Sequence, residues 1–337
     1  MNDNHHSPAD DTDLAVDATG LVKTFGVKGS HTVRAVDGID LQVRRGEVFG
    51  VLGPNGAGKT TTLSMLATLL PIDGGRASIF GVDVATQPHM VRQLLGVTGQ
   101  YASVDENLTG SENLYLFGRL LGLSRAGARR TAAELLESFG LTEAADRQIA
   151  QFSGGMRRRL DLAASLIARP PLIFLDEPTT GLDPRTRSQM WDTIRALVDG
   201  GATVLLTTQY LDEADQLADR IAVIDRGAKV AEGAPAQLKS SVGNSTLQIR
   251  LADRDQTSTA AHLVERTLGE APVLTPEAGG LSIALPDANR AADVLIALRQ
   301  ADLSITTAAV QQPTLDEVFL ALTGHHTETE TETEEVA

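Results

Sequence analysis

Short apolar runs alternate with amphipathic stretches over residues 14–233. The apolar run Val48–Leu52 precedes a helical pattern over Lys59–Leu70, and Leu172–Asp176 precedes a helical pattern over Pro184–Val198. Strand patterns that alternate with helix patterns are typical of α/β proteins. The spacing therefore predicts an α/β domain in this part of the chain.

A helical stretch interrupts this alternation. Ser111 can cap a helix that runs through Leu121. A second helix before Gly140 is indicated by apolar residues at positions i, i+3, i+4 and i+7, which are Ala132, Leu135, Leu136 and Phe139. We expect a helical subdomain at about residues 101–165, inserted into a domain that spans residues 14–240.

The alternation restarts at a smaller scale after Gly233. The predicted elements are a strand over 247–251, a helix over 260–268, a strand near 273, a strand over 281–285, a helix over 290–299 and a strand over 305–310. This βαββαβ order is that of a ferredoxin-like split unit. We therefore predict a small α+β accessory domain over residues 245–324, where packing is the only visible chemistry.

Composition limits the classes of protein that the chain can be. Its 337 residues, 42% of them apolar and 4% aromatic, suffice for one α/β domain and a smaller appendage. The absence of cysteine excludes disulfides and thiolate metal sites. No segment approaches the roughly 18 apolar residues of a spanning helix, and the polar start does not resemble a signal peptide. We expect a chain that neither spans a membrane nor is secreted.

The net charge of −15 is concentrated at the two ends. Residues 1–13 carry four Asp and residues 325–337 carry five Glu, with no Lys or Arg in either segment, which leaves −6 for the body. Like-charged segments of low complexity stay solvated, so we predict two disordered acidic tails. An acidic body would repel a phosphate backbone, so nucleic acid is an unfavourable partner.

One glycine-rich turn fits a phosphate-binding loop. It consists of Gly53, Pro54, Asn55, Gly56, Ala57, Gly58, Lys59 and Thr60, between a strand pattern and a helix pattern. Glycines let successive N–H groups face one anion, Lys59 can reach the β- and γ-phosphates, and Thr60 can ligate Mg²⁺. The alternative is an ordinary strand-to-helix turn, but the match and its context favour the P-loop.

Two adjacent carboxylates follow the buried strand pattern that ends at Asp176. The carboxyl end of such a strand is where an open α/β sheet exposes catalytic groups. We predict that Asp176 holds Mg²⁺ and that Glu177 polarises the attacking water as general base. A strand end with two solvated carboxylates is the alternative, which the P-loop makes less favourable.

A second glycine pair lies at the start of a helix. Ser153 occupies an N-cap position, and Gly154 and Gly155 expose several N–H groups that could face an anion. Capping alone is the alternative reading, but the pattern predicts a second phosphate site. We interpret Arg157–Arg159, which leans off the apolar stripe, as a solvated helix face with no catalytic role.

The motifs together resemble the ATP-binding cassette (ABC) ATPases. The matching strings, in the family's order, are GPNGAGKTT (53–61, with Thr61 last), Gln100, FSGGM (152–156), LIFLDEP (172–178) and Gly181-Leu182-Asp183. The resemblance covers roughly residues 15–235. It implies ATP and Mg²⁺ as ligands and a head-to-tail homodimer, in which the Ser153 loop of one chain closes on ATP held by the P-loop of the other.

The same resemblance assigns further roles. Phe25 would stack on adenine, although core packing is its alternative role. Gln100 would sense Mg²⁺ and the γ-phosphate while contacting a membrane partner, and Asp183 would cross the dimer interface. Two residues depart from the family pattern, because Met156 replaces the usual Gln and Gln209 replaces the usual switch His. We expect Met156 to pack and Gln209 to donate one neutral hydrogen bond.

A subgroup is similar over longer strings. VTGQYASVDENLTG (97–110), SGGMRRRLDLAASL (153–166), TTQYLDEADQLADRIAVID (207–225) and LDEVFLALTG (315–324) resemble the daunorubicin/doxorubicin resistance ATP-binding proteins. This resemblance implies an ATPase that drives export of a drug or other hydrophobic compound through a separately encoded membrane permease, at the cytoplasmic face of the cell membrane. An ABC ATPase that acts on the ribosome or DNA, and an importer ATPase, are the alternatives.

Overall fold

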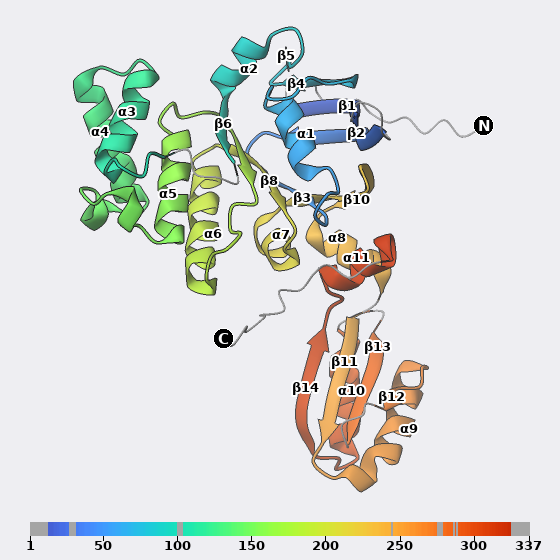
Figure 1. The fold of residues 1–337 in the computed structure, drawn as a ribbon. Coiled ribbons are helices and arrows are strands. Elements are labelled where there is room, and N and C mark those ends of the chain that lie inside the picture. The colour runs from blue at the N-terminus through green and yellow to red at the C-terminus, as the bar shows by residue number, and fades with distance from the viewer. Residues whose placement is uncertain are drawn as a thin grey trace, which may run out of the picture. The chain divides into compact units, whose positions relative to one another are not determined.

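The computed structural model describes residues 13–26, 32–99, 104–243, 245–274, 279–285, 287 and 289–324 (Figure 1). These residues form two compact units, one that ends at Pro235 and one that begins at Ala236. No helix in these ranges is long and apolar enough to cross a membrane.

The centre of the first unit is a six-stranded sheet in the order β10-β9-β3-β8-β7-β6. Its strands are β3 (Val48–Leu52), β6 (Leu95–Thr98), β7 (Leu172–Asp176), β8 (Thr203–Thr208), β9 (Arg220–Asp225) and β10 (Ala228–Gly233). Strands β6, β7, β8, β3 and β9 are parallel neighbours, and β10 is antiparallel. Every residue of β3, β7 and β8 is buried, as expected for strands covered on both faces. The predicted α/β fold is confirmed.

The expected strand–helix alternation is wrong for the start of the chain. There, β1 (Leu14–Gly26), β2 (Thr32–Arg44), β4 (Gly74–Ile79) and β5 (Val82–Asp83) form an antiparallel sheet in the order β2-β1-β4-β5. The cause is visible in β2, which buries alternate residues and so has the period of a strand rather than of a helix. Register shifts in the β1–β2 ladder accompany the positive φ of Gly20.

Helices cover the parallel sheet and form the inserted segment. They are α1 (Lys59–Leu66), α2 (Pro88–Leu94), α3 (Gly110–Leu120), α4 (Arg125–Ser138), α5 (Gly154–Ser165), α6 (Pro184–Asp199) and α7 (Leu211–Leu217). Helix α1 ends earlier than predicted, before Thr68, which has a left-handed φ of 61°. Ser111 does not cap α3. Thr109 does, because its side chain accepts from the Glu112 amide while the Glu112 carboxylate accepts from the Thr109 amide.

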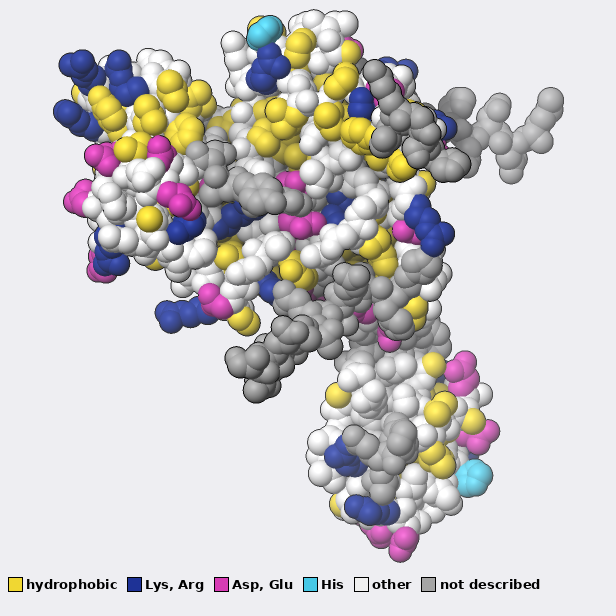
Figure 2. Space-filling model, in the orientation of Figure 1, with side chains coloured by type: hydrophobic (Ala, Val, Ile, Leu, Met, Phe, Trp, Pro, Cys, Tyr) yellow, Lys and Arg dark blue, Asp and Glu magenta, His cyan; other side chains and the backbone are white. Residues whose placement is uncertain are grey.

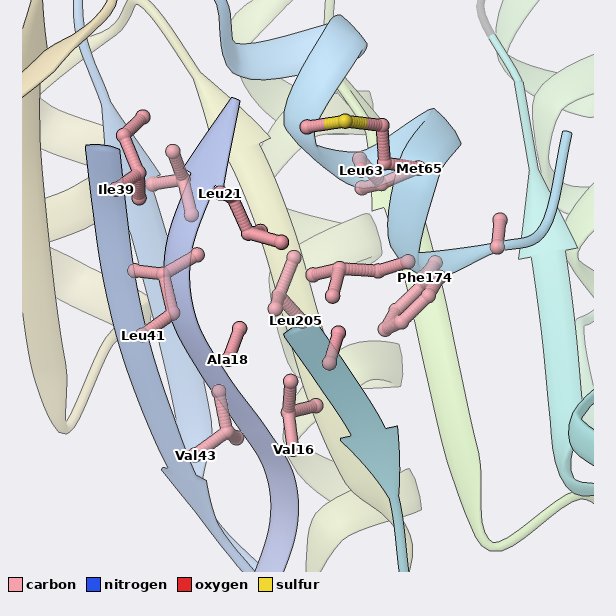
Figure 3. Close-up of a cluster of buried hydrophobic side chains, with 14 of the residues drawn as sticks. Val16, Ala18, Leu21, Ile39, Leu41, Val43, Leu63, Met65, Phe174 and Leu205 are labelled. Atoms are coloured by element: carbon pink, nitrogen blue, oxygen red, sulfur yellow. The ribbon is translucent and has the colours of Figure 1, made fainter. Parts of the chain in front are cut away.

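Two apolar cores stabilise this unit. The first lies between the antiparallel sheet, α1 and the parallel sheet, where Val16, Leu41, Met65 and Phe174 are fully buried (Figure 3). The second joins the inserted helices to the other face of the parallel sheet. Met156 packs against this second core, as its sequence position predicts. The strands that carry the predicted site are therefore fixed from both sides.

The second unit has the predicted βαββαβ order. Its elements are β11 (Ser245–Leu251), α9 (Thr257–Leu268), β12 (Val273–Leu274), β13 (Gly280–Leu285), α10 (Arg290–Gln300) and β14 (Ile305–Gln311), with α8 (Pro235–Val242) before them and α11 (Leu315–Thr323) after them. The strands form an antiparallel sheet in the order β12-β13-β11-β14, which is ferredoxin-like. Alternate residues of β11 and β13 pack against α9 and α10 in one core.

Candidate functional site

The P-loop lies between β3 and α1, at the carboxyl end of the parallel sheet. A side chain at Gly53 would place its Cβ 2.2 Å from the Ile224 carbonyl oxygen, and one at Gly58 would meet the Ala35 carbonyl oxygen at 2.3 Å. Gly58 also has a φ of 104°. Only glycine fits these two positions, so the loop can keep its backbone N–H groups turned toward one anion.

The Lys59 side chain is buried beneath this loop. Its Nζ donates to the carbonyl oxygens of Gly53 at 2.8 Å and Pro54 at 3.1 Å. Glu177 Oε1 lies 3.4 Å from the same nitrogen. Burial lowers the pKa of Lys59, while the charges of Glu177 and Asp176 oppose that change. One ammonium group thus contacts both the phosphate loop and the predicted general base, Glu177.

Asp176 is held from two sides by hydroxyl groups. Thr60 Oγ1 donates to Asp176 Oδ1 at 3.0 Å, and Thr207 Oγ1 donates to the same oxygen at 2.5 Å. A hydroxyl and a carboxylate at the mouth of a P-loop are oxygen ligands of the kind that Mg²⁺ prefers. The predicted magnesium ligands Thr60 and Asp176 therefore fit the ion. In the described ranges, no group of three or more His, Cys, Asp or Glu forms a separate metal site.

Glu177 has a constrained backbone. Its φ is 48°, a left-handed value that is unusual for a residue other than glycine. Its amide donates to Thr207, to the carbonyl oxygen and to Oγ1, at 3.1 Å in both cases. The Thr180 hydroxyl lies 3.4 Å from Oε2. These contacts turn the Glu177 carboxylate toward Lys59, where a water next to a bound phosphate could be polarised.

Thr207 is a site residue that the sequence reasoning missed. It is fully buried on β8, and its hydroxyl donates to the Asp176 carboxylate and accepts from the Glu177 backbone amide. A signal was present, because β8 follows the pattern of a buried strand yet ends in two threonines. The missing information was that β8 lies beside β7 in the sheet.

The interpretation of Arg157–Arg159 as a solvated face is wrong for Arg158. Its guanidinium donates to the carbonyl oxygens of Asp176 at 2.8 Å, Glu177 at 3.1 Å and Pro178 at 3.0 Å, and also to that of Gly99. Burial lowers the pKa of Arg158, and the neighbouring carboxylates oppose that change. The stripe of apolar residues on α5 could not reveal this contact, because the carbonyls come from distant loops.

A buried carboxyl lies behind the strand ends. Glu213 on α7 accepts from Thr179 Oγ1 at 2.8 Å and from Trp191 Nε1 at 3.3 Å. Burial raises the pKa of Glu213, against the effect of these hydrogen bonds.

Gln209, which we expect to donate one neutral hydrogen bond, directly follows β8 and is half-buried.

Ser153 and Asp183 are both helix caps in this chain. Ser153 Oγ accepts from the Met156 amide at 3.3 Å, and Asp183 accepts from the Thr186 amide at 3.0 Å. A Cβ at Gly154 would meet open space. The helix that Ser153 caps packs into the second apolar core, whereas the helix that follows the P-loop packs into the first.

Phe25 and Gln100 are the two remaining predicted residues. Phe25 is 44% exposed near the end of β1, with Lys23 Nζ 5.8 Å from its ring centre. This exposure argues against a core role for Phe25. Gln100 lies outside the described residues.

Comparisons with known proteins agree with this geometry. The ABC transporter family model matches residues 36–180, and the model of the DrrA1-3-like ATP-binding protein C-terminal domain matches residues 233–323. The daunorubicin/doxorubicin resistance ATP-binding protein DrrA of Streptomyces peucetius is 55% identical over 311 residues, which cover 92% of this chain and 93% of that protein.

Two further similarities extend the comparison. The Nod factor export ATP-binding protein I of Burkholderia orbicola is 42% identical over 255 residues, which cover 74% of this chain and 82% of that protein. A dimeric ATP-binding cassette in a post-hydrolysis state with ADP and phosphate superposes with a TM-score of 0.60 at 26% identity, over 65% of this chain and 98% of that one. These matches bear out the family and the fold that the sequence motifs predict.

Proposed function

The chain belongs to the ABC transporter ATP-binding proteins, and from this premise we propose that it drives export of a drug or other hydrophobic compound through a separately encoded membrane permease. The observation that carries the proposal is the convergence of Lys59, Thr60, Asp176 and Glu177 at the ends of β3 and β7. Similarity to a drug-resistance ATP-binding protein over both units supports the choice of export over import.

In the proposed reaction, the P-loop amides and Lys59 bind the β- and γ-phosphates of ATP. Thr60 and Asp176 hold Mg²⁺, with Gln100 as a further contact from the family resemblance. The ion supplies charge neutralisation on the phosphate oxygens. Glu177 orients the attacking water and accepts its proton, while Phe25 stacks on the adenine.

Closure of the site requires a second copy of the chain. The exposed Gly154 amide region and Ser153 would cover the γ-phosphate held by the partner, and Asp183 would lie near the dimer axis. The dimeric state of the superposed cassette supports this arrangement. ATP would therefore close the dimer, and hydrolysis would open it.

We infer that a groove on the first unit receives the permease. It encloses about 980 Å³ between β6 and the inserted helices, with Val97, Phe117, Leu121 and Leu123 among its apolar lining residues. Figure 2 shows hydrophobic side chains gathered over these elements. The groove adjoins Gly96 and Val97 on β6, shortly before Gln100, so a docked segment would respond to the nucleotide. The chain would then act at the cytoplasmic face of the membrane.

The second unit would support assembly, because its described residues form a packed core without a phosphate motif. The ribosome and DNA alternatives lack support, since the body is acidic. The proposal is tested by co-expressing the chain with a membrane protein encoded in the adjacent reading frame. The measurement is the ATP-dependent accumulation of a fluorescent anthracycline in inverted vesicles. Accumulation that Glu177→Gln abolishes supports export; equal accumulation without ATP contradicts it.

A further inference from the structure

We propose that Arg158 is a positioning residue that couples the two nucleotide sites of the dimer, by linking the Ser153 loop to the hydrolytic carboxylate of the same chain. The inference rests on the head-to-tail dimer proposed above. In that dimer, Ser153 acts on the nucleotide of the partner, whereas Glu177 acts on the nucleotide of its own chain. A link between them would therefore connect one site to the other.

Arg158 binds four backbone carbonyl groups near the site. Its Nη2 donates to the carbonyl oxygens of Asp176 and Glu177 at 2.8 and 3.1 Å, and its Nε donates to that of Pro178 at 3.0 Å. Its Nη1 donates to the carbonyl of Gly99, the residue before Gln100. One guanidinium therefore binds the backbone on either side of the water-activating carboxylate and the start of the γ-phosphate-sensing segment.

The helix that carries Arg158 also carries the Ser153 cap. Ser153 is the N-cap of α5, and Arg158 lies within the same helix. A hydrogen-bonded helix moves as a rigid element over so short a length. A shift of α5 when Ser153 engages the partner's nucleotide is thus transferred to the backbone of Glu177, whose left-handed φ of 48° must be held by its surroundings.

The adjacent arginines bind other partners. Arg157 binds the Glu106 carboxylate at 2.8 Å and the Ala150 carbonyl, and Arg159 binds the Phe139 carbonyl at 3.2 Å. These partners all belong to the inserted segment that also contains α5. Of the hydrogen bonds described here for the three side chains, those of Arg158 reach the end of the parallel strand β7.

The test compares Arg158→Gln and Arg158→Lys with Arg157→Gln as the matched control. Gln removes the charge and most donors, whereas Lys keeps the charge but not the planar fork. We expect Arg158→Gln to keep the ATP Kd within about twofold, since the P-loop is untouched, and to lower kcat by about tenfold. The Hill coefficient for ATP hydrolysis should fall from about two in the wild type toward one in Arg158→Gln, and Arg158→Lys should have an intermediate value.

The Hill coefficient distinguishes coupling from a purely structural role of Arg158, because a smaller folded fraction lowers the rate but does not change the Hill coefficient. Arg158→Gln with wild-type cooperativity would overturn the inference, as would an equal loss of cooperativity in Arg157→Gln. Failure of the proposed function looks different. The wild-type chain would then not hydrolyse ATP, and the Glu177→Gln variant would not dimerise in MgATP. If Arg158→Gln unfolds, Arg158→Lys carries the test, and wild-type cooperativity in that folded variant also contradicts the coupling.

Discussion

Thr207→Val offers the sharpest test of how the carboxylate pair is held. Valine has nearly the shape of threonine, but it removes the hydroxyl that donates to Asp176 Oδ1 at 2.5 Å and accepts from the Glu177 amide. A hydrogen bond to a charged group contributes about 1.5–3 kcal/mol. Since 1.36 kcal/mol corresponds to a tenfold rate change, we expect kcat to fall by about ten- to a hundredfold.

The assay is steady-state phosphate release at saturating ATP over a range of Mg²⁺ concentrations. Thr207→Ser keeps the hydroxyl and should restore most of the rate. Thr203→Val is the matched control, because Thr203 is equally buried at the other end of β8 and its hydroxyl accepts from the Gly46 amide at 3.0 Å. A wild-type rate and Mg²⁺ dependence for Thr207→Val, in a folded protein, would refute the proposed positioning of Asp176.

Three further outcomes are expected. Lys59→Ala should weaken ATP binding by about ten- to a hundredfold in calorimetry, because a charge-assisted contact of about 1.5–3 kcal/mol is lost; unchanged binding would contradict the P-loop assignment. Gln209→Ala should slow hydrolysis by about two- to tenfold, against about a hundredfold for Glu177→Gln, and equal losses in phosphate release would contradict the dominance of Glu177. Burial raises the pKa of the Glu213 carboxyl above its ordinary value of 4.5. The protonated carboxyl therefore stabilises the fold fully when the pH is below 4.5, and this stabilisation is lost as the pH rises through the folded-state pKa. Glu213→Gln should therefore flatten the pH dependence and raise the unfolding midpoint at pH 8 by about 2–4 °C, as measured by scanning calorimetry; a lower midpoint would show that the ionised carboxylate is the stabilising form.

Local signals account for what the sequence could predict. The P-loop glycines and the strand that ends at Asp176 are contiguous patterns, and each lies where the structure has the corresponding element. The same holds for the βαββαβ order of the second unit, since each element there has a clear period. Short-range chemistry also predicted the Ser153 cap.

Contacts between distant segments could not be predicted in this way. Thr207 contacts Asp176 because β8 lies beside β7, and strand order is not encoded in the periodicity of either strand. Arg158 lies off the apolar stripe of α5, so local pattern favours solvent, yet four backbone carbonyls from other loops surround its guanidinium. The capping box of Thr109 is a different case, because Thr109 and Glu112 form a local three-residue pattern that competes with the nearby Ser111.

The oligomeric state of Glu177→Gln in MgATP, measured by size-exclusion chromatography with light scattering, tests most directly whether two chains share each nucleotide site. This variant keeps the phosphate loop but lacks the carboxylate that activates water, so ATP should remain bound and hold the dimer closed. We expect a stable dimer with MgATP, a monomer with MgADP, and loss of the dimer when Ser153→Arg is added. A Glu177→Gln chain that binds MgATP but stays monomeric and hydrolyses ATP at the wild-type rate would contradict both the role of Glu177 and the shared site.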